Sequence, residues 1–317
     1  MIYTIVKMKF ILKNIAGFVV GSFVLASFVI FVLSKPALAP ETESGKTNKN
    51  IDSANERIFP TNGNALINDQ AIQAKSYIVY DKDTGKVLAS RASDTSLPIA
   101  SITKLMTGYL VHVYGSLDDS VTVQPKNELS VSPTLGVIRG DSIQIEDLFK
   151  SMIIGSANDA ALTLGSYIET KTGKKIDEAM NEEAEKLGMV NTRFNNALGF
   201  DSETNYSTAD DIRLLLAAIH KYPVFELIDR ELSYSFTSNT GRSYSVRATN
   251  KLLSRDPEIH AVKTGFTNEA QGAMITSIVH KNGKFIVIVL GSQNRESDTI
   301  LLKNRIIKTF YTATQPL

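Results

Sequence analysis

The apolar and polar positions of the chain divide it into three parts. An uncharged run of 19 residues extends from Ile15 to Leu33, and a polar stretch rich in Pro, Thr, Ser, Asn, Glu and Lys begins at Pro36. From residue 69 onwards, short apolar runs alternate with polar and turn-forming residues. This pattern predicts an N-terminal segment over residues 1–35, a disordered polar linker over 36–68 and a folded domain over 69–317.

The folded part mixes helical and strand-like patterns. Apolar residues three or four positions apart predict helices, and short continuous apolar runs bounded by turn residues predict strands. An Asn-Gly pair between two such runs is typical of a tight hairpin turn. The expected elements are a hairpin around Asp83–Lys86, helices at Asp211–Ile219 and Ser297–Phe310, and strands at Ala273–Val279 and Phe285–Leu290 joined by Asn282-Gly283.

The uncharged run is long enough to cross a membrane, because a spanning helix needs about 20 residues. Lys7, Lys9 and Lys13 precede it, and positive flanks stay on the cytoplasmic side. We therefore expect a single-pass anchor in the cell membrane, with the folded domain extracytoplasmic. The alternative is a cleaved signal peptide, since Ala37-Leu38-Ala39 resembles a cleavage site. Against it, the run exceeds the roughly 7–15 apolar residues of a signal, and Pro40 would follow the cut.

Composition narrows the possible chemistry. With 317 residues, 43% of them hydrophobic, the chain can form a sizeable core. A net charge of +1 argues against a nucleic-acid partner. The absence of cysteine excludes disulfides and thiolate metal sites, and the four histidines form no close pair in the sequence. We expect no metal and no cofactor.

The first of three motifs is Ser101-Ile102-Thr103-Lys104, which opens a stretch with helical apolar spacing. Two side chains three residues apart on a helix lie on one face, so Ser101 and Lys104 can meet. The helix dipole at this end favours negative charge on an attacking oxygen. Taken alone, the same residues could be a helix-capping serine and a solvated lysine.

Two further motifs follow, Ser156-Ala157-Asn158 and Lys263-Thr264-Gly265. Ser156 falls between two helix-like stretches, where a turn can place Ser156 and Asn158 in a cleft. Taken alone, Ser156 could instead cap the second helix. Lys263 adjoins strand-like runs, and a strand can line a cleft with Lys263, Thr264 and the bare backbone of Gly265.

Short motifs also occur by chance, and local sequence separates the copies. Ser53-Ala54-Asn55 and Ser292-Gln293-Asn294 repeat the second motif, and Lys171-Thr172-Gly173 repeats the third. The last copy lies at a predicted helix end, with Gly173 as the C-cap and lysines near the negative end of the dipole. We therefore reject Lys171 as a site residue.

The ordered motif set resembles the D-alanyl-D-alanine carboxypeptidases, the low-molecular-weight penicillin-binding proteins. The resemblance covers roughly residues 69–317 and implies a transpeptidase-like α+β fold, in which early and late strands form one antiparallel sheet flanked by a helical region. It implies peptidoglycan stem peptides as substrates and β-lactam antibiotics as inhibitors. The supporting phrases include Ser76–Leu88, Pro98–Thr107, Ser156–Ala161, Tyr206–Asp211 and Lys263–Thr267.

The resemblance also implies catalytic roles. Ser101 attacks the carbonyl between two D-alanines, and Lys104 removes its proton. Lys104 must be partly neutral for this, and burial and the nearby cation Lys263 would both lower its pKa. Ser156 passes a proton to the leaving amine.

The other implied residues bind substrate. Asn158 holds the substrate amide and Lys104, and the backbone N–H groups of Ser101 and Phe266 bind the oxyanion. The residues expected around the terminal carboxylate are Lys263, Thr264, Gly265 and Arg295.

Three departures from the family pattern bear on substrate preference but remove no catalytic atom. They are Ala157 in place of a common glycine, the lack of a histidine near Asn196–Phe200, and Gln271, which splits the usual Ala-Gly pair. Besides a carboxypeptidase, with endopeptidase activity open, the alternatives are a β-lactamase and a catalytically idle wall-binding protein. The β-lactamase alternative lacks a match to the loop that carries the deacylating glutamate of class A enzymes.

Overall fold

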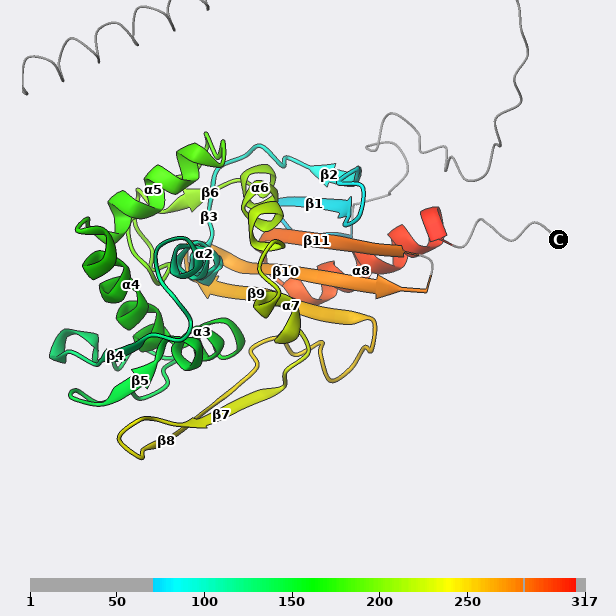
Figure 1. The fold of residues 1–317 in the computed structure, drawn as a ribbon. Coiled ribbons are helices and arrows are strands. Elements are labelled where there is room, and N and C mark those ends of the chain that lie inside the picture. The colour runs from blue at the N-terminus through cyan, green and yellow to red at the C-terminus, as the bar shows by residue number, and fades with distance from the viewer. Residues whose placement is uncertain (1–70, 282, 312–317) are drawn as a thin grey trace, which may run out of the picture. The chain divides into compact units, whose positions relative to one another are not determined.

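The computed structural model describes residues 71–281 and 283–311, and a five-stranded antiparallel sheet lies at its centre (Figure 1). The strand order is β2-β1-β11-β10-β9. Ser76 pairs with Leu290 and Asp81 with Phe285, which joins the beginning of the described domain to its end. The strands are β1 (Ser76–Asp81), β2 (Val87–Arg91), β9 (Ile259–Thr267), β10 (Gln271–His280) and β11 (Gly283–Ser292).

Both faces of the sheet are buried. Successive side chains of a strand point to opposite faces. Ile286 and Ile288 therefore join a core with helices α2 (Lys104–Tyr114) and α6 (Ala209–Ile219), while Val287 and Val289 pack with α8 (Arg295–Ile306). Burial on both sides explains why the late strands are continuous apolar runs in the sequence.

A group of helices packs beside the sheet, with α2 in the middle (Figure 1). Helices α3 (Ile145–Ile154), α4 (Asn158–Thr172) and α5 (Ile176–Lys186) all contact α2. The smaller elements are 3-10 turns η1 (Ala100–Thr103) and η2 (Pro125–Asn127), helix α7 (Val224–Leu227), and the strand pairs β3 (Leu97–Pro98) with β6 (Tyr206–Ser207), β4 (Ser120–Thr122) with β5 (Ser142–Gln144), and β7 (Ser233–Thr237) with β8 (Ser243–Arg247).

The elements expected from the sequence are present, and the α+β class is confirmed. The closing helix begins at Arg295, two residues earlier than expected, because the Asn294 side chain caps it by accepting the backbone N–H of Ser297 at 3.0 Å. It continues into a π-helical turn, η3 (Ile307–Tyr311).

Some expectations fall on other parts of the chain. Asn282 of the predicted hairpin turn, the run Ile15–Leu33 and the linker lie outside the described residues. Among the residues that are described, no helix combines the length and apolarity needed to cross a bilayer.

Candidate active site

Ser101 lies in η1, the 3-10 turn that leads into α2. Lys104 Nζ donates a hydrogen bond to Ser101 Oγ at 2.8 Å, so the two side chains meet as their spacing predicted. Ser101 is partly exposed, whereas Lys104 is fully buried. The pair therefore places a hydroxyl at the surface directly over a buried amine.

The surroundings of Lys104 suit a general base. Its Nζ also donates to Asn158 Oδ1 at 2.8 Å and to the backbone oxygen of Leu198 at 2.5 Å. A neutral amine has two N–H groups and one lone pair. The protonated amine donates to all three oxygens, whereas in the neutral form these two acceptors occupy both N–H groups and the lone pair faces Ser101 Oγ. Burial lowers the pKa of Lys104 to about 7, so a substantial fraction is neutral near neutral pH.

Asn158 is held in one orientation. Its Nδ2 donates to the backbone oxygen of Val131 at 2.8 Å, which leaves Oδ1 facing Lys104. The asparagine of the second motif therefore contacts Lys104, as predicted.

Ser156 occupies the turn between α3 and α4, where the sequence placed it. Its φ is +58°, a left-handed conformation that costs a non-glycine residue roughly 1–2 kcal/mol. Lys263 Nζ donates to Ser156 Oγ at 2.8 Å. The capping alternative is wrong, because the N-cap of α4 is Ala157 and no side chain caps it.

Lys263 and Thr264 lie on β9, the edge strand of the sheet, and both are nearly fully buried. Burial lowers the pKa of Lys263, and the charges of Lys104 and Arg295 lower it further. The sequence predicted that the charge of Lys263 would help to lower the pKa of Lys104. In the structure, charge repulsion between the two lysines lowers the pKa of Lys263, whereas burial alone lowers that of Lys104. Among the described residues, no carboxylate is bonded to Lys263. A substrate anion would therefore supply the counter-charge that a buried, protonated Lys263 lacks.

Two glycines allow the backbone to approach Ser101. A Cβ on Gly265 would lie 2.9 Å from the Ser101 nitrogen, and one on Gly199, whose φ is +90°, would lie 1.9 Å from the Ala100 oxygen. The start of η1 is therefore enclosed between the third motif and the loop around Gly199. Phe266 follows Gly265 on β9, with its side chain 63% exposed.

Arg295, at the start of α8, reaches the third motif from the side. Its guanidinium donates to the backbone oxygen of Gly265 and, through Nε, to Glu296 Oε1 at 3.2 Å. The structure therefore places Arg295 beside the predicted carboxylate site, and its contact with substrate stays a prediction.

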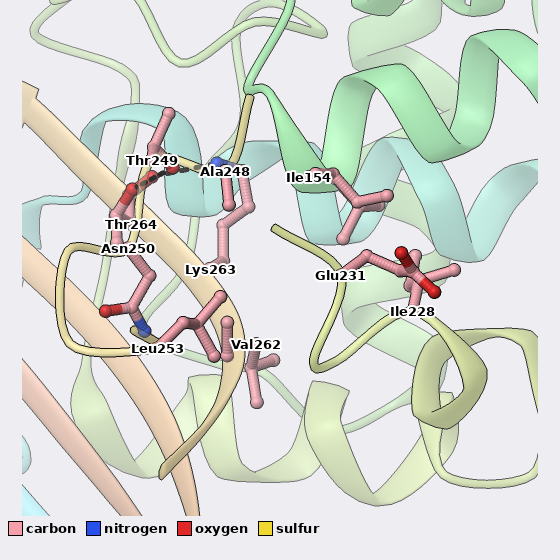
Figure 2. Close-up of a pocket in the computed structure, with 12 residues that line it drawn as sticks. Ile154, Ile228, Glu231, Ala248, Thr249, Asn250, Leu253, Val262, Lys263 and Thr264 are labelled. Atoms are coloured by element: carbon pink, nitrogen blue, oxygen red, sulfur yellow. Dashed lines mark hydrogen bonds between the residues drawn. The ribbon is translucent and has the colours of Figure 1, made fainter. Parts of the chain in front are cut away.

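The structure also shows functional groups that the sequence interpretation missed. Leu198 contributes a backbone oxygen, which side-chain patterns cannot reveal. Gly199 follows an asparagine whose Oδ1 accepts three backbone N–H groups, so the Asn-x-x-Gly spacing was a usable turn signal. Thr249, whose Oγ1 lies 2.6 Å from Thr264 Oγ1, gave no signal (Figure 2).

The described chance copies of the second and third motifs make contacts outside the candidate site. Lys171 lies in the last turn of α4 and pairs with Asp119 Oδ2 at 2.8 Å, and Gly173 is the left-handed C-cap, as predicted. Ser292 donates to Asp298 Oδ2, and the copy at Ser53 lies outside the described residues. The described part of the chain holds no group of three His, Cys, Asp or Glu residues able to bind a metal.

The fold and the three clustered motifs define a protein of the penicillin-binding type. Residues 63–294 match the family model of the D-alanyl-D-alanine carboxypeptidases, peptidase family S11. The chain belongs to this family.

Individual relatives agree. The chain is 29% identical over 229 residues to the D-alanyl-D-alanine carboxypeptidase DacF of Bacillus subtilis, covering 70% of this chain and 58% of that protein. It is 35% identical to a D-alanyl-D-alanine endopeptidase of Escherichia coli, covering 69% of this chain and 71% of that one. The chain thus spans somewhat more than half the length of DacF and similar carboxypeptidases.

Solved structures share the fold. The Streptomyces K15 DD-transpeptidase superposes with a TM-score of 0.68 at 27% identity, covering 74% of this chain and 97% of that one. Penicillin-binding protein D2 of Listeria monocytogenes, in an ampicillin-bound form, superposes with a TM-score of 0.64 at 29% identity, covering 74% and 98%.

Proposed function

We propose that this protein is a serine-type D-Ala-D-Ala carboxypeptidase that removes the terminal D-alanine from peptidoglycan stem peptides and is acylated by β-lactams. The observation that carries the proposal is the buried Lys104 amine, hydrogen-bonded to Ser101 Oγ, with its two other acceptors already in place. A serine hydroxyl is a weak nucleophile unless such a base lies within hydrogen-bond reach.

Acylation follows from these contacts. Lys104 takes the Ser101 proton as Oγ bonds to the carbonyl carbon of the penultimate D-alanine. The backbone N–H groups of Ser101 and Phe266 would stabilise the oxyanion, and one such donor is typically worth about 3 kcal/mol. Because Lys263 donates to Ser156 Oγ, the hydroxyl proton of Ser156 is free to pass to the leaving nitrogen as the C–N bond breaks. The proton that Lys104 took from Ser101 then restores the Ser156 hydroxyl, which leaves Lys104 neutral for deacylation.

Deacylation needs only water and the same base. Once the terminal D-alanine has left, Lys104 can activate a water molecule that attacks the ester carbon, and Ser101 regains its proton. The carboxylate of the substrate would lie against Lys263, Thr264 and the Gly265 backbone, with Arg295 beside them.

The direct test combines a labelled-penicillin gel, mass spectrometry of the adduct, and D-alanine release from diacetyl-Lys-D-Ala-D-Ala. The wild type should form an adduct on the Ser101 peptide and release D-alanine, and Ser101→Ala should do neither. Lys171→Ala, in the second K-T-G, is the matched control and should behave as the wild type. An adduct on Ser156 would overturn the assigned roles.

A second candidate activity is endopeptidase cleavage of cross-linked stem peptides. It is favoured by relatives named D-alanyl-D-alanine endopeptidase, at 35% identity in Escherichia coli and 33% in Pseudomonas aeruginosa. Incubation with purified cross-linked muropeptide dimers would show monomers by chromatography if this activity is present, and Ser101→Ala should abolish their formation.

We also propose that the protein is held in the cell membrane by residues 15–33, with the catalytic domain extracytoplasmic. The support is the length of the uncharged run and the three lysines before it. Peptidoglycan lies outside the cytoplasmic membrane, so this orientation would place the enzyme with its substrate.

A further inference from the structure

Thr249 links two of the three motifs. It follows β8 by two residues, and its backbone N–H donates to the oxygen of Ile154, the last residue of α3, at 3.2 Å. Ile154 lies two residues before Ser156. The Thr249 hydroxyl lies 2.6 Å from the hydroxyl of Thr264 on β9, and Figure 2 shows the two side chains facing each other. One residue therefore contacts both the helix end before Ser156 and the third motif.

The direction of the hydrogen bond between the two hydroxyls matters for binding. Each threonine has one O–H to donate, and an ionised carboxylate only accepts. If Thr264 is to donate its proton to a substrate carboxylate, Thr249 must be the donor in the 2.6 Å contact. The Thr249 hydroxyl then occupies a lone pair of Thr264 Oγ1 and polarises its O–H. Such a chain of hydrogen bonds strengthens the terminal bond to the charged acceptor.

We propose that Thr249 is a positioning residue for carboxylate recognition: it donates to Thr264 Oγ1 and thereby turns the Thr264 proton toward the substrate carboxylate. This inference rests on the proposed function, because it assigns a role within the same substrate site. It predicts that the Thr249 hydroxyl affects binding of the carboxylate and leaves the Ser101–Lys104 chemistry unaltered, since no hydrogen bond within the described part of the chain joins Thr249 to either residue.

The test compares Thr249→Val, which removes the hydroxyl and keeps the shape, with Thr249→Ser, which keeps the hydroxyl. Each is assayed on diacetyl-Lys-D-Ala-D-Ala and on the same peptide ending in a carboxamide. For Thr249→Val, kcat/KM should fall about tenfold on the carboxylate peptide, equivalent to about 1.4 kcal/mol, and stay within about twofold on the amide. Thr249→Ser should stay within about threefold on both. The pH midpoint of penicillin acylation should not move in either variant.

Thr276→Val is the matched control, since Thr276 on β10 is fully buried and its hydroxyl has no partner among the described residues. It should match the wild type on both peptides. Equal losses of Thr249→Val on the two peptides, or the same loss in Thr249→Ser, would show that Thr249 serves packing alone and would overturn the inference.

A failure of the proposed function gives a different result. If the wild type is acylated by penicillin but cleaves neither peptide, the carboxypeptidase assignment is wrong. The positioning role is then decided by acylation with penicillin, which carries a carboxylate, against its methyl ester. Selective slowing of Thr249→Val with the acid supports the role, and equal slowing with both overturns it.

Discussion

The position of Lys104 disfavours the charged form of its amine. It is fully buried, and its three hydrogen-bond acceptors, Ser101 Oγ, Asn158 Oδ1 and the oxygen of Leu198, are all uncharged. No carboxylate of the described residues is paired with its charge, so burial shifts Lys104 toward the neutral form that can act as a base. A side chain whose usual pKa is about 10.4 can therefore be neutral near pH 7 in this position.

The lowered pKa of Lys104, about 7, predicts how acylation depends on pH. In the proposed mechanism the neutral form of Lys104 is the base, so the second-order rate of penicillin acylation should rise as pH increases through about 7 and then level off. Stopped-flow or quenched acylation between pH 5.5 and 9 would measure this. Lys104→Arg, which stays protonated throughout this range, should remain inactive, and a flat profile in the wild type would contradict Lys104 as the base.

Lys263 is the residue that should distinguish a free carboxylate from an amide. A hydrogen bond to a charged group is worth roughly 1.5–3 kcal/mol, so Lys263→Ala should lose roughly 10- to 150-fold in kcat/KM on peptides that end in a carboxylate. The loss on carboxamide analogues should be much smaller. Equal losses would mean that Lys263 acts mainly through Ser156, and Lys171→Ala again serves as the control.

At the scale of elements, the site depends on the close approach of three backbone segments: the loop around Gly199, η1 and β9. The loop around Gly199 packs against η1, β9 closes the other side at Gly265, and α8 holds the Gly265 oxygen through Arg295. The loop also supplies an uncharged oxygen, from Leu198, to Lys104. These contacts position Ser101 without any catalytic side chain from the loop itself.

Gly199→Ala should therefore displace Ser101, the proposed nucleophile. The added Cβ would lie 1.9 Å from the Ala100 oxygen, so the Ala100–Ser101 peptide must move. We expect acylation to fall by roughly 100-fold, as a displacement of about 1 Å can cost, with a lowered melting temperature. Gly188→Ala is the matched control, because Gly188 also has a positive φ, +77°, but nothing lies within 4 Å of its Cβ position. It should lose only roughly 1–2 kcal/mol of stability and keep full acylation.

The hydrogen bonds around Ser101 and Lys104 also bear on β-lactam turnover. A class A β-lactamase deacylates through a water-activating glutamate, whereas no carboxylate among the described residues is hydrogen-bonded to Ser101 or Lys104. With a β-lactam the leaving amine stays tethered and blocks water, so the acyl-enzyme should persist for much longer than the peptide intermediate. Mass spectrometry over time would follow the adduct. Rapid multiple turnover of a chromogenic cephalosporin, without D-alanine release from peptide, would instead favour the β-lactamase alternative.

At the scale of the whole molecule, the catalytic domain joins its two ends in one sheet, with β1 paired to β11. The third motif lies on the edge strand of that sheet, and the first two lie at helix ends beside it. Lys263, Ser156, Asn158 and Lys104 become neighbours only when sheet and helices dock. Partial unfolding at this junction should therefore abolish acylation before the sheet itself is lost.

The N-terminal run gives a prediction at the same scale. Envelope fractions should contain the protein with residues 15–33 still attached. The run is long, the lysines before it are typical of a cytoplasmic flank, and we expect Pro40 to hinder cleavage after Ala39. N-terminal sequencing of the mature protein would distinguish an uncleaved anchor from a cleaved signal peptide. A soluble protein that starts at Pro40 would show that the run is a signal peptide.

The sequence by itself determined the family, the three motifs and most of the elements that carry them. Ser101 and Lys104 lie three residues apart on one helical turn, and Gly173 ends α4, so local spacing was enough to predict both. Continuous apolar runs also predicted β10 and β11, which are buried on both faces, and helical apolar spacing predicted α6.

Only the tertiary structure decided how the motifs meet. Lys263 lies 107 residues from Ser156, and Lys104 lies 94 residues from the Leu198 oxygen that it binds. A backbone oxygen has no side-chain signature, the burial that lowers the pKa of Lys104 exists only in the packed core, and Thr249 became visible only because its hydroxyl faces Thr264. Local patterns predict elements because they depend on neighbours in the chain, whereas burial and long-range hydrogen bonds depend on which elements dock.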